Sequence, residues 1–572
     1  MKNELVIKIF RSIAQILELQ EVPWKPQAYQ KVVRVIEGLT EDVEDIYHRE
    51  GLPGILNLPG VGENLGKKIE EIILTGKLEY YNKLKKEVKI DIDELSSIPT
   101  LGPKKIKFLY AKLNIKNAED LKKAILQQKL RELPGFGAET EKKLLEGIAF
   151  IRSKPKRFLY AQALPIVREL NSTLKSLEGV DQVEVAGSFR RGQETIGDLD
   201  FLIISKKQEI VMKHFTSLPM VKEIIAHGLT KSSIRLGNGM QVDLRVVKKK
   251  ELGSALNYFI GSKAHNVELR KLALKKGFTL SEYGLFRHTT PKRWVAGRTE
   301  EEIYHKLKMQ YIPPELRENT GEIAAALQHH LPKLVTVKDM NGLFHTHTLW
   351  SDGTSSILEM TKKAELLRMK FISFADHYST MGVTNPLNEK KLDQYLKEIE
   401  HVQKTSRIKI FSGAEIDINK DGDLVIPRHR LKDLDVVIAS VHSSLQMREE
   451  EMTSRIMKCL KNWDIDILGH PTNRLIQERP PIQANLDHIF QEAKDKGIFL
   501  EINTQPSRLD LNGQNIKKAG EFGCRFTISP DAHSLQGLET FPLGILQARR
   551  GWLEKKDLVN SWNISKIEKE FS

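Results

Sequence analysis

The pattern of hydrophobic and polar residues changes twice along the 572-residue chain. Near the N-terminus, Leu5, Ile9, Ile13 and Leu17 recur every four residues and predict an amphipathic helix. In the middle of the chain, the runs VEVA and MQVDLRVV predict strands. From about residue 341 onward, apolar runs alternate with charged helical segments, which indicates β/α units around a largely parallel sheet or barrel.

Nearly every predicted strand of this last part ends in a side chain that can bind a metal. The strand runs are FISFADH, IKIFSGAEIDI, DVVIASVH, IDILGHPT, GIFLEINT and FTISPDAH. The candidate ligands are His345, His347, Asp352, His377, Glu415, His442, His470, Asp531 and His533. One histidine at a strand end is usually a hydrogen-bonded core residue. Ligand-type residues at so many strand ends instead predict the active site of a β/α barrel.

Three aspartates lie on the predicted strands of the middle part. Asp198 and Asp200 are two residues apart in GDLDFLIIS, so both carboxylates project from one face of a strand, and Asp243 lies in MQVDLRVV. Like charges held together require a neutralising cation, and oxygen ligands favour Mg²⁺. The arrangement predicts in-line attack of a 3′-hydroxyl on an α-phosphorus at a two-metal site.

The turn GSFRRG, ahead of the aspartate pair, completes the predicted nucleotide site. Gly187, Ser188 and Arg191 can hold the outgoing phosphates through a backbone N–H, a hydroxyl and a guanidinium. An isolated DxD pair is often only a solvated acidic strand end, but GS followed by GDxD and a later strand aspartate is typical of nucleotidyltransferases. Enzymes that add nucleotides to RNA or to small molecules share this pattern, so the pattern leaves the substrate open.

A turn suited to phosphate binding occurs three times in the N-terminal part. The copies are LPGVGENLGKKIEEII (58–73), IPTLGPKKIKFLYAKL (98–113) and LPGFGAETEKKLLEGI (133–148). Glycines let the backbone approach closely, N–H groups at a helix N-terminus face an anion, and lysines attract a polyanion. These segments resemble helix-hairpin-helix motifs, which bind the DNA backbone; packing corners capped by glycine are the alternative. The expected DNA-binding residues are Gly60, Gly62, Lys67, Gly102, Lys104, Gly135 and Gly137. Thr100 replaces a glycine in the middle copy.

Charge and composition indicate what kind of partner the protein binds and where in the cell it is located. A net charge of +14 and a pI near 9.3 favour a polyanionic partner. The two cysteines, Cys459 and Cys524, exclude a disulfide framework and Cys-type zinc fingers, so His, Asp and Glu must hold any metal. Lys8 and Arg11 interrupt the N-terminal apolar run, and no apolar run is as long as a transmembrane helix. We therefore expect a cytoplasmic protein with no membrane partner.

The segment YFIGSKAHNVELRKLALKKGFTLSEYGLF (258–286) narrows the substrate. Together with GSFRRG, GDLD and the hairpins before them, it resembles the family X DNA polymerases, DNA polymerase beta among them, over roughly the first 315 residues. The resemblance implies that Asp198, Asp200 and Asp243 are the catalytic metal ligands. The nucleotide-binding residues that it implies are Gly187, Ser188, Arg191, Gly197, Tyr258, Phe259, Gly261, Asn266 and Arg270.

Some positions in the polymerase-like part match the family pattern, and others depart from it in ways that affect the expected nucleotide and metal contacts. Tyr258 and Phe259 match the aromatic pair at the sugar of the incoming nucleotide, and a buried aromatic cluster is the alternative. Lys263 stands where polymerase beta carries an acidic residue, so nucleotide contacts there are expected to differ. Gln241 replaces the arginine expected two residues before Asp243, which changes the partner of the catalytic carboxylates.

Polymerases of the beta type can also remove a 5′-deoxyribose phosphate through a lysine Schiff base. The matching position is Lys68, with Lys25 and Tyr29 at supporting positions. Neighbouring cations such as Lys67 can lower the pKa of the attacking amine. Asn64 stands where a lysine that binds the 5′-phosphate is expected, and a solvated surface lysine is the alternative role for position 68.

The strand-end pattern HTHTLWSDG, DH, GAE, SVH, GHP and PDAH resembles the PHP (polymerase and histidinol phosphatase) family over residues 341–572. The resemblance implies a distorted seven-stranded β/α barrel with up to three metals, and mixed imidazole and carboxylate ligands favour Mn²⁺ or Zn²⁺. It implies one metal on His345, His347, Glu415 and Asp531, a second on Glu415, His442 and His470, and a third on Asp352, His377 and His533. Arg474 and Arg508 are expected to clamp a phosphate.

These expectations combine into one multidomain enzyme. We expect helical DNA-binding domains over 1–82 and 83–154, a nucleotidyltransferase palm over 155–249, a thumb over 250–316, a linker over 317–340 and a PHP phosphoesterase barrel over 341–572. The palm and thumb would extend gapped or primed DNA with dNTPs, using Mg²⁺ or Mn²⁺, in the repair of short gaps. The barrel would hydrolyse 3′-terminal phosphodiesters, with cleavage at abasic sites as a further option.

The alternative is a DNA-binding nucleotidyltransferase fused to a histidinol-phosphatase-like phosphatase of small molecules. In either case we expect a monomer in the bacterial cytoplasm or nucleoid.

Overall fold

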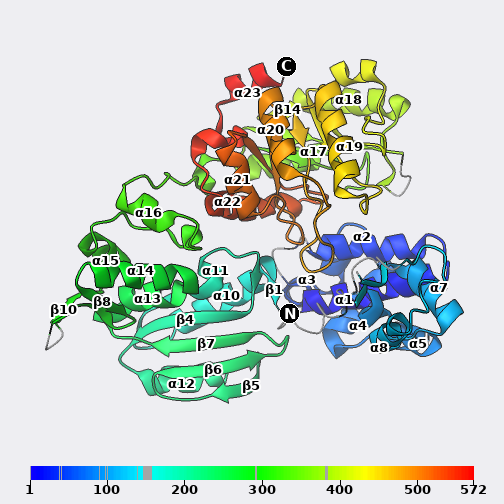
Figure 1. Ribbon diagram of the computed structural model, residues 1–572. Coiled ribbons are helices and arrows are strands. Elements are labelled where there is room, and N and C mark those ends of the chain that lie inside the picture. Colours follow the sequence, from blue (N-terminus) through cyan, green and yellow to red (C-terminus); the bar gives the residue numbers. More distant parts are fainter. Residues whose placement is uncertain are drawn as a thin grey trace.

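The computed structural model describes residues 2–37, 39, 42–88, 90–96, 98, 101–137, 140–142, 144–145, 148, 157–289, 293–380 and 384–571. Thr100, part of the segment after the third hairpin and the expected domain boundary at 154–155 lie outside these residues. Figure 1 shows a helical N-terminal part, a central part built on an open sheet, and a C-terminal part that lies against both.

The N-terminal part consists of short helices whose apolar residues meet in two clusters. The helices are α1 (Lys2–Leu19), α2 (Lys25–Glu37), α3 (Val43–Leu56), α4 (Glu63–Thr75), α5 (Glu79–Glu87), α6 (Ile92–Ser96), α7 (Pro103–Leu113) and α8 (Ala118–Leu126). Along α1, Ile9, Ile13 and Leu17 are buried, as their spacing predicts. One cluster is centred on α1 to α5 and the other on α6 to α8. The first hairpin and the two later ones therefore belong to separate cores.

The central part is a five-stranded sheet with the strand order β2-β4-β7-β6-β5. The strands are β2 (Val180–Val185), β4 (Asp198–Ser205), β5 (Val221–Ala226), β6 (Lys231–Leu236) and β7 (Gln241–Val246), and β1 (Phe158–Leu159) pairs with β3 (Thr195–Ile196). The helices beside it are α10 (Tyr160–Lys175), α11 (Gly187–Arg190) and α12 (Gln208–Thr216). Leu199 and Phe201 pack in one cluster with α10 and α12, whereas Leu202 packs in another cluster across the sheet. Alternation therefore places Asp200 on the face opposite α10 and α12.

The thumb follows the sheet. Its elements are α13 (Leu252–Ile260), α14 (Lys263–Lys275), β8 (Phe278–Ser281), β9 (Gly284–Arg287), β10 (Arg293–Ala296), α15 (Glu300–Lys306) and α16 (Glu322–Leu327). Residues from the first part of the segment 317–340, expected to be a linker, pack into the thumb core. Arg317 and Glu322 are fully buried, and Ala326 joins the apolar cluster. Arg317 donates from Nη1 to Glu300 at 2.6 Å, and a charged side chain can be buried when it is paired in this way.

The C-terminal part has the predicted α/β architecture. Its strands are β11 (Gly342–Thr346), β12 (Phe371–Phe374), β13 (Asp376–Tyr378), β14 (Lys409–Phe411), β15 (Gly413–Asp417), β16 (Val436–Ser440), β17 (Ile467–Leu468), β18 (Phe499–Asn503) and β19 (Phe526–Ser529). All of them pair in parallel, in the orders β11-β12-β14 and β13-β15-β16-β17-β18-β19. Single residues, Ala375 and Ser412, separate β12 from β13 and β14 from β15. A bridge between Thr346 and Ala532 brings β11 beside the end of β19, so the ring of strands is distorted and divided into two sheets.

Helices surround these strands (Figure 1). They are α17 (Ile357–Leu366), α18 (Glu389–Gln403), α19 (Glu449–Asn462), α20 (Leu486–Lys496), α21 (Gly513–Glu521), α22 (Phe541–Arg550) and α23 (Ile564–Glu570). Phe344, Phe371, Phe411 and Phe499 of four strands form one buried cluster with Phe571, next to α23. This apolar cluster leaves the carboxyl ends of the strands for polar side chains.

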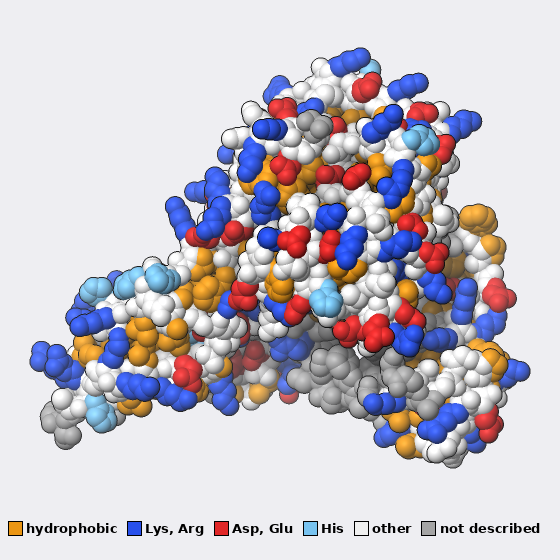
Figure 2. All heavy atoms as spheres, turned by 45° about the horizontal axis from the view of Figure 1, so that its top comes forward, with side chains coloured by type: hydrophobic (Ala, Val, Ile, Leu, Met, Phe, Trp, Pro, Cys, Tyr) orange, Lys and Arg blue, Asp and Glu red, His pale blue; other side chains and the backbone are white. Residues whose placement is uncertain are grey.

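The barrel is joined to the central part by close packing and ion pairs. A Cβ at Gly192 would lie 2.4 Å from Cγ of Leu546, on α22. Arg549 donates to Glu315 at 2.8 Å. Figure 2 shows Lys and Arg side chains spread across one face of the whole molecule. Among the described residues, no helix combines the length and the apolar character needed to cross a membrane.

Two candidate metal-dependent active sites

The nine predicted ligand side chains lie at the carboxyl ends of the barrel strands. They come from β11 (His345), the loop after it (His347, Asp352), β13 (His377), β15 (Glu415), and the loops after β16 (His442), β17 (His470) and β19 (Asp531, His533). Three of them have positive φ: His345 at 57°, His470 at 26° and Asp531 at 49°. Such backbone conformations cost energy and cluster at functional sites, where the surrounding packing holds them.

Glu415 lies at the centre of these ligands and presents one carboxylate oxygen to each of two groups. Its Oε2 is 3.3 Å from Nε2 of His345 and 2.9 Å from Nδ1 of His377. Its Oε1 is 3.2 Å from Nε2 of His442 and 2.9 Å from Nε2 of His470. A carboxylate placed between two groups of imidazoles is suited to bridge two cations.

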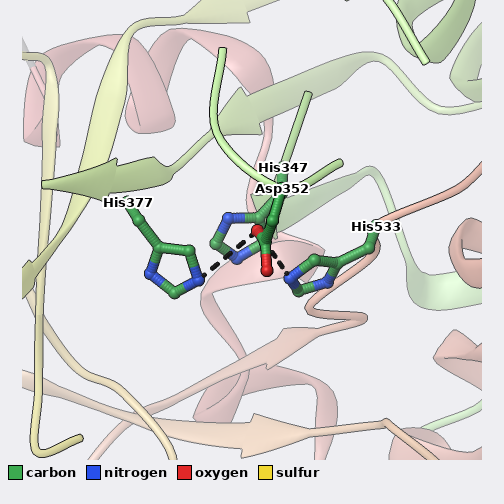
Figure 3. Close-up of side chains that lie close together, drawn as sticks. All are labelled: His347, Asp352, His377 and His533. Carbon is green, nitrogen blue, oxygen red and sulfur yellow. Dashed lines mark ion pairs between the residues drawn. The ribbon is translucent and has the colours of Figure 1, made fainter. Parts of the chain in front are cut away.

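Two other carboxylates, those of Asp531 and Asp352, also lie beside ligand histidines. Oδ1 of Asp531 is 3.2 Å from Nε2 of His347. Oδ1 of Asp352 is 3.2 Å from Nε2 of His533 and 3.6 Å from Nε2 of His377 (Figure 3). Among the described residues, three groups of ligand atoms lie within 4.8 Å of one another: His347, Asp352, His377 and His533; His345, His347 and Asp531; and His377, Glu415 and His442. His347 and His377 each belong to two of these groups.

The loop that carries Asp352 is fixed by buried partners. Asp376 accepts hydrogen bonds from the N–H of Thr348 at 2.8 Å and from Oγ of Ser351 at 2.6 Å. A Cβ at Gly353 would lie 2.6 Å from the carbonyl oxygen of Thr348, so a larger residue does not fit there. Asp352 is therefore presented by a loop with little room to rearrange.

Burial and neighbouring charges set the protonation of two of these side chains, Glu415 and His347. Burial by itself would raise the pKa of Glu415, but His442 and the neighbouring histidines hold it well below its usual value. Burial, together with His533 and His377, lowers the pKa of His347 to about 3. The carboxylate therefore stays ionised, and the imidazole of His347 stays neutral, which is the form that binds a metal.

Several ligand atoms are buried without a hydrogen-bond partner among the described residues. They are Nε2 of His345, Nδ1 and Nε2 of His347, Oδ1 of Asp352 and Nδ1 of His470. Three of them, Nε2 of His345, Nε2 of His347 and Oδ1 of Asp352, lie 3.2–3.3 Å from a carboxylate or imidazole atom without forming a hydrogen bond, and an ion held between the two groups would satisfy both. These atoms fit the donor set of a metal centre.

Two acidic residues that support the ligands were not predicted. Glu501 accepts a hydrogen bond from Nδ1 of His345 and one from the backbone N–H of His470 at 2.6 Å. Asp417 accepts from Nδ1 of His442 at 2.7 Å. Such partners fix which ring nitrogen faces the metal. The signal was strand alternation, since Glu501 shares its strand face with Phe499, which lies in the barrel interior.

The two expected phosphate-clamping arginines lie in different surroundings. Arg508 donates to Asn473 at 2.8 Å, and its Nε is 3.9 Å from Oδ2 of Asp531, beside the metal ligands. Arg474 instead donates to both carboxylate oxygens of Glu194, near the palm, at 2.9 and 2.7 Å. Arg508 is therefore the one placed to meet a phosphate, whereas Arg474 joins two domains.

The three aspartates of the central part lie on neighbouring parallel strands. Asp200 on β4 pairs with Asp243 on β7, and Asp198 pairs with Gln241. Burial, then Asp198 and Asp243, raise the pKa of Asp200 to about 7. Gln241, which replaces the expected arginine, donates to Oδ1 of Asp243 at 3.0 Å. Lys231 on β6 was not predicted, and its Nζ is 3.3 Å from Oδ2 of Asp243. The carboxylates thus have few cationic neighbours and suit a bound cation.

The turn after β2 lies directly against the aspartates. Gly187 has φ +64°, and a Cβ there would lie 2.6 Å from Oδ2 of Asp200. Ser188 follows in the short helix α11. A Cβ at Gly197, just before the aspartate pair, would lie 3.1 Å from Nη1 of Arg157. Glycine at 187 therefore allows the backbone to approach the site closely.

Arg191 is held by partners from the thumb and the barrel. Its Nε donates to Glu318 at 2.9 Å, and its Nη1 donates to the carbonyl of Ile260. Arg550 of the barrel donates to the carbonyl of Arg191 at 2.9 Å. A Cβ at Gly261 would lie 3.1 Å from Nη1 of Arg191. The expected phosphate-binding arginine thus lies where palm, thumb and barrel meet.

The expected nucleotide-selecting residues form one contiguous group on α13 and α14. Tyr258 and Phe259 meet edge to face, with ring centroids 5.0 Å apart, and the guanidinium of Arg245 lies 4.5 Å from the Phe259 centroid. Asn266 donates to the carbonyl of Tyr258 at 2.7 Å. Arg270 donates to the carbonyl of Asn266 at 3.1 Å. Tyr258 is 39% exposed, so its ring is not part of a buried aromatic core.

The hairpins present open backbone at their glycines. Gly62 and Gly102 cap the N-termini of α4 and α7, and Gly60 and Gly135 have φ of +73° and +81°. No atom of the described residues would lie within 4 Å of a Cβ at Gly62, Gly102, Gly135 or Gly137. Lys67 and Lys104 are exposed beside them. This geometry is suited to phosphate contacts.

Lys68 lies in a partly buried aromatic environment. Its Nζ is 4.7 Å from the ring centroid of Tyr80 and 5.7 Å from that of Tyr29. It donates a hydrogen bond to Asn64. Burial, then Lys25, lower the pKa of its amine, which is the direction that a nucleophile needs.

Five family models match successive parts of the chain. They are a helix-hairpin-helix domain (1–78), a SAM-like helix-hairpin-helix tandem (92–149), a DNA polymerase beta palm (162–249), a DNA polymerase beta thumb (255–318) and a PHP domain (344–505). Their order is the order of parts described above.

Among curated proteins, the chain is 33% identical over 572 residues to DNA polymerase/3′-5′ exonuclease PolX of Bacillus subtilis (strain 168), which covers 99% of both chains. It is 28% identical over 236 residues to a probable phosphatase of Thermoanaerobacter sp. (strain X514), covering 39% of this chain and 91% of that one. A probable phosphatase of Clostridium acetobutylicum is 28% identical over 237 residues, covering 40% of this chain and 90% of that one.

Proposed function

The chain belongs to the family of DNA polymerase/3′-5′ exonuclease PolX, and from this premise we propose that it extends and shortens DNA strands at two separate metal centres. The identity of 33% to a member extends over 99% of both chains. The alternative of a small-molecule phosphatase fused to a DNA-binding module gains no support from that relative. The probable phosphatases match about two fifths of this chain.

We assign strand extension to Asp198, Asp200 and Asp243. Two Mg²⁺ or Mn²⁺ ions, when bound, would supply activation of the primer 3′-hydroxyl and a counter-charge for the leaving pyrophosphate. The carboxylates would hold these ions, and the raised pKa of Asp200 reflects the charge that the ions would neutralise. Gly187 lets the backbone of the turn approach the aspartates closely, and Arg191, which pairs with Glu318, is the assigned phosphate-binding cation. The residues assigned to sugar, base and template are Tyr258, Phe259, Asn266 and Arg270.

We assign strand shortening to the barrel centre. Mn²⁺ or Zn²⁺, when bound, would supply an activated water for attack on phosphorus and a counter-charge for the leaving oxygen. Glu415 contacts His345 through one carboxylate oxygen and His442 through the other, and it would therefore contribute to two of the three metal positions. Glu501 and Asp417 orient His345 and His442, and Arg508 is placed to receive a non-bridging phosphate oxygen.

The observation that carries this proposal is the presence of two clusters of side chains suited to metals, one at the barrel strand ends and one on β4 and β7. A labelled gapped primer–template incubated with Mn²⁺, with and without dNTPs, tests it in three proteins. We expect Asp243→Ala to shorten the primer without extending it, and His345→Ala to extend it without shortening it. Each retained activity controls for the folding of its variant. Shortening that persists in His345→Ala would remove the nuclease from the barrel.

The side chains of each cluster all come from one chain, so we also propose that the enzyme acts as a monomer on gapped or primed duplex DNA. Sedimentation of the protein with and without such DNA tests this. A boundary for one protein per DNA supports the monomer, and a protein dimer as the active species contradicts it.

A second candidate activity is removal of a 5′-deoxyribose phosphate by Lys68, which the lowered pKa of its amine favours. Borohydride trapping on DNA with a 5′-deoxyribose phosphate should give a covalent adduct in the wild type and none in Lys68→Ala. Lys83→Ala is the matched control, because Lys83 is an exposed lysine of the same helical part, on α5, and has no assigned role. Equal trapping by all three proteins would refute the assignment.

A further inference from the structure

A cavity of about 1280 Å³ opens beside the barrel centre, where three parts of the chain meet. Its walls come from α1 and α2, from α10 beside the palm sheet, and from the barrel segments 475–479, 505–507 and 530–534. The metal ligands Asp352 and His533 form part of the wall. Pockets for small molecules usually hold about 300–1,000 Å³, so this space is large even for such a ligand.

Arg34 on α2 connects the helical part directly to the metal centre. Its Nη1 is 2.7 Å from Oδ2 of Asp352. The other oxygen of the same carboxylate, Oδ1, faces His533 and His377. Arg34 can therefore orient Asp352 without occupying the oxygen that faces the cation position. A strand that lies along α2 would have its end at the metal ligands.

Basic residues line the cavity from three helices. Lys8 lies on α1, Lys31 and Arg34 on α2, and Arg168 on α10. Lys8 and Arg168 are exposed side chains that line the cavity. A phosphate backbone is drawn to such a set of separated cations irrespective of base sequence.

The acidic residues of the wall, apart from the metal ligands, are either paired or gathered together. Glu478 is 2.7 Å from the guanidinium of Arg11. Asp45 and Asp42 lie near Glu169, since they, after burial, raise the pKa of that carboxyl. A polyanion would therefore avoid the Glu169 side and follow the basic residues.

We propose that this cavity binds a single DNA strand whose 3′ end enters the barrel centre. The proposal rests on the strand-shortening function assigned above to the barrel. No Phe, Tyr or Trp occurs among the described residues of the wall. Binding therefore depends on contacts to phosphates rather than on base stacking, and it weakens steeply as salt is added. The helical part thus serves the nuclease as well as the polymerase.

Binding of a fluorescein-labelled oligothymidylate to the full-length protein, followed by anisotropy in EDTA, tests the cavity without any catalysis. We expect Lys8→Glu combined with Arg168→Glu to weaken binding about tenfold or more at low salt and to flatten its salt dependence. Lys175→Glu is the matched control, because Lys175 is exposed at the end of α10 and does not border the cavity. Unchanged binding in the double variant, or an equal loss in the control, would overturn the proposal.

Photocrosslinking from a 3′-terminal 4-thiothymidine, also in EDTA, locates the strand end. We expect adducts on α2 or on the barrel segments 505–507 and 530–534, which lie beside the metal ligands. Adducts confined to the palm and thumb would contradict the proposal.

The failure of this proposal can be told apart from failure of the assigned function. If the charge reversals change neither binding nor shortening while His345→Ala abolishes shortening, the cavity is not the strand site and the barrel remains the nuclease. If His345→Ala still shortens DNA, the barrel assignment fails, and the binding and crosslinking results in EDTA still decide whether a strand occupies the cavity.

Discussion

The barrel centre and the palm centre hold acidic residues in opposite electrostatic states. In the barrel, histidines surround Glu415 and hold its pKa well below the usual value, against the effect of burial. In the palm, burial and two neighbouring carboxylates raise the pKa of Asp200 to about 7. The first centre is balanced by its own imidazoles, whereas the second carries unbalanced negative charge.

This difference indicates how each centre is completed. The barrel ligands come from successive strand ends and are already within contact distance of one another. The palm has three carboxylates on two strands, with Lys231 beside one of them, so its cations need further ligands from the nucleotide. We therefore expect the barrel to bind metal by itself and the palm to bind metal together with substrate.

The largest expected effect comes from Glu415→Gln, because Glu415 faces two of the ligand groups at once. Primer shortening should fall by about a thousandfold, which corresponds to several kcal/mol of lost stabilisation of the transition state. Primer extension by the same protein should stay near the wild-type rate. Quantitative gel assays of both activities measure this. A loss of both activities would mean that the two centres are not independent.

A large effect confined to the palm is expected from Gly187→Ala. The added Cβ would lie 2.6 Å from Oδ2 of Asp200 at a positive φ, so the turn and the carboxylate must shift. We expect the extension rate to fall by about a hundredfold, as displacement of catalytic groups by about 1 Å can cause. Gly237→Ala is the control, because a Cβ there contacts no atom of the described residues within 4 Å. Equal rates for the two variants would contradict this close approach.

A smaller effect in the barrel is expected from Glu501→Gln. The amide still accepts a hydrogen bond but loses the charge that orients His345, so shortening should slow by about tenfold. The half-saturating Mn²⁺ concentration should rise as well. Glu521→Gln, at an exposed position on α21, is the control. Wild-type Mn²⁺ dependence in Glu501→Gln would show that this contact does not tune the ligand.

The smallest expected effect is a change in the unfolding temperature of the metal-free protein, measured in EDTA, on substitution of Asp200. Because the folded pKa of Asp200 is raised from 3.8 to about 7, the folded state holds this proton more tightly than the unfolded state. The contribution of Asp200 to the free energy of unfolding is therefore lost as the pH rises from 3.8 to about 7. Asp200→Asn should remove that part of the loss and raise the unfolding temperature at pH 8 by about 2–4 °C relative to the wild type. Parallel pH profiles of the two proteins in calorimetry would contradict the raised pKa.

The sequence predicted the elements and ligands that depend on local pattern. Strand ends are visible in apolar runs, so residues such as His377 and His470 could be identified from the order of residues alone. Glu501 was missed because it lies within an apolar run, and only the inward direction of alternate residues distinguishes it. Lys231 was missed because the order of strands brings it beside Asp243.

Contacts between domains could not be predicted from local pattern. Arg474 pairs with Glu194, 280 positions away, and Arg34 pairs with Asp352, 318 positions away. The burial of Arg317 within the expected linker likewise depends on its pair with Glu300. Each of these contacts depends on how separately folded domains pack against one another. The composition and the periodicity of the sequence do not predict that packing.

The most direct test of the two-centre account is calorimetric titration of Mn²⁺ into the wild type, His345→Ala and Asp243→Ala, with and without a non-hydrolysable dNTP. We predict tight Mn²⁺ binding without nucleotide that is lost in His345→Ala and kept in Asp243→Ala. We predict additional binding with nucleotide that shows the reverse dependence. Tight binding without nucleotide that is lost in Asp243→Ala, or additional binding that survives in it, would contradict the account.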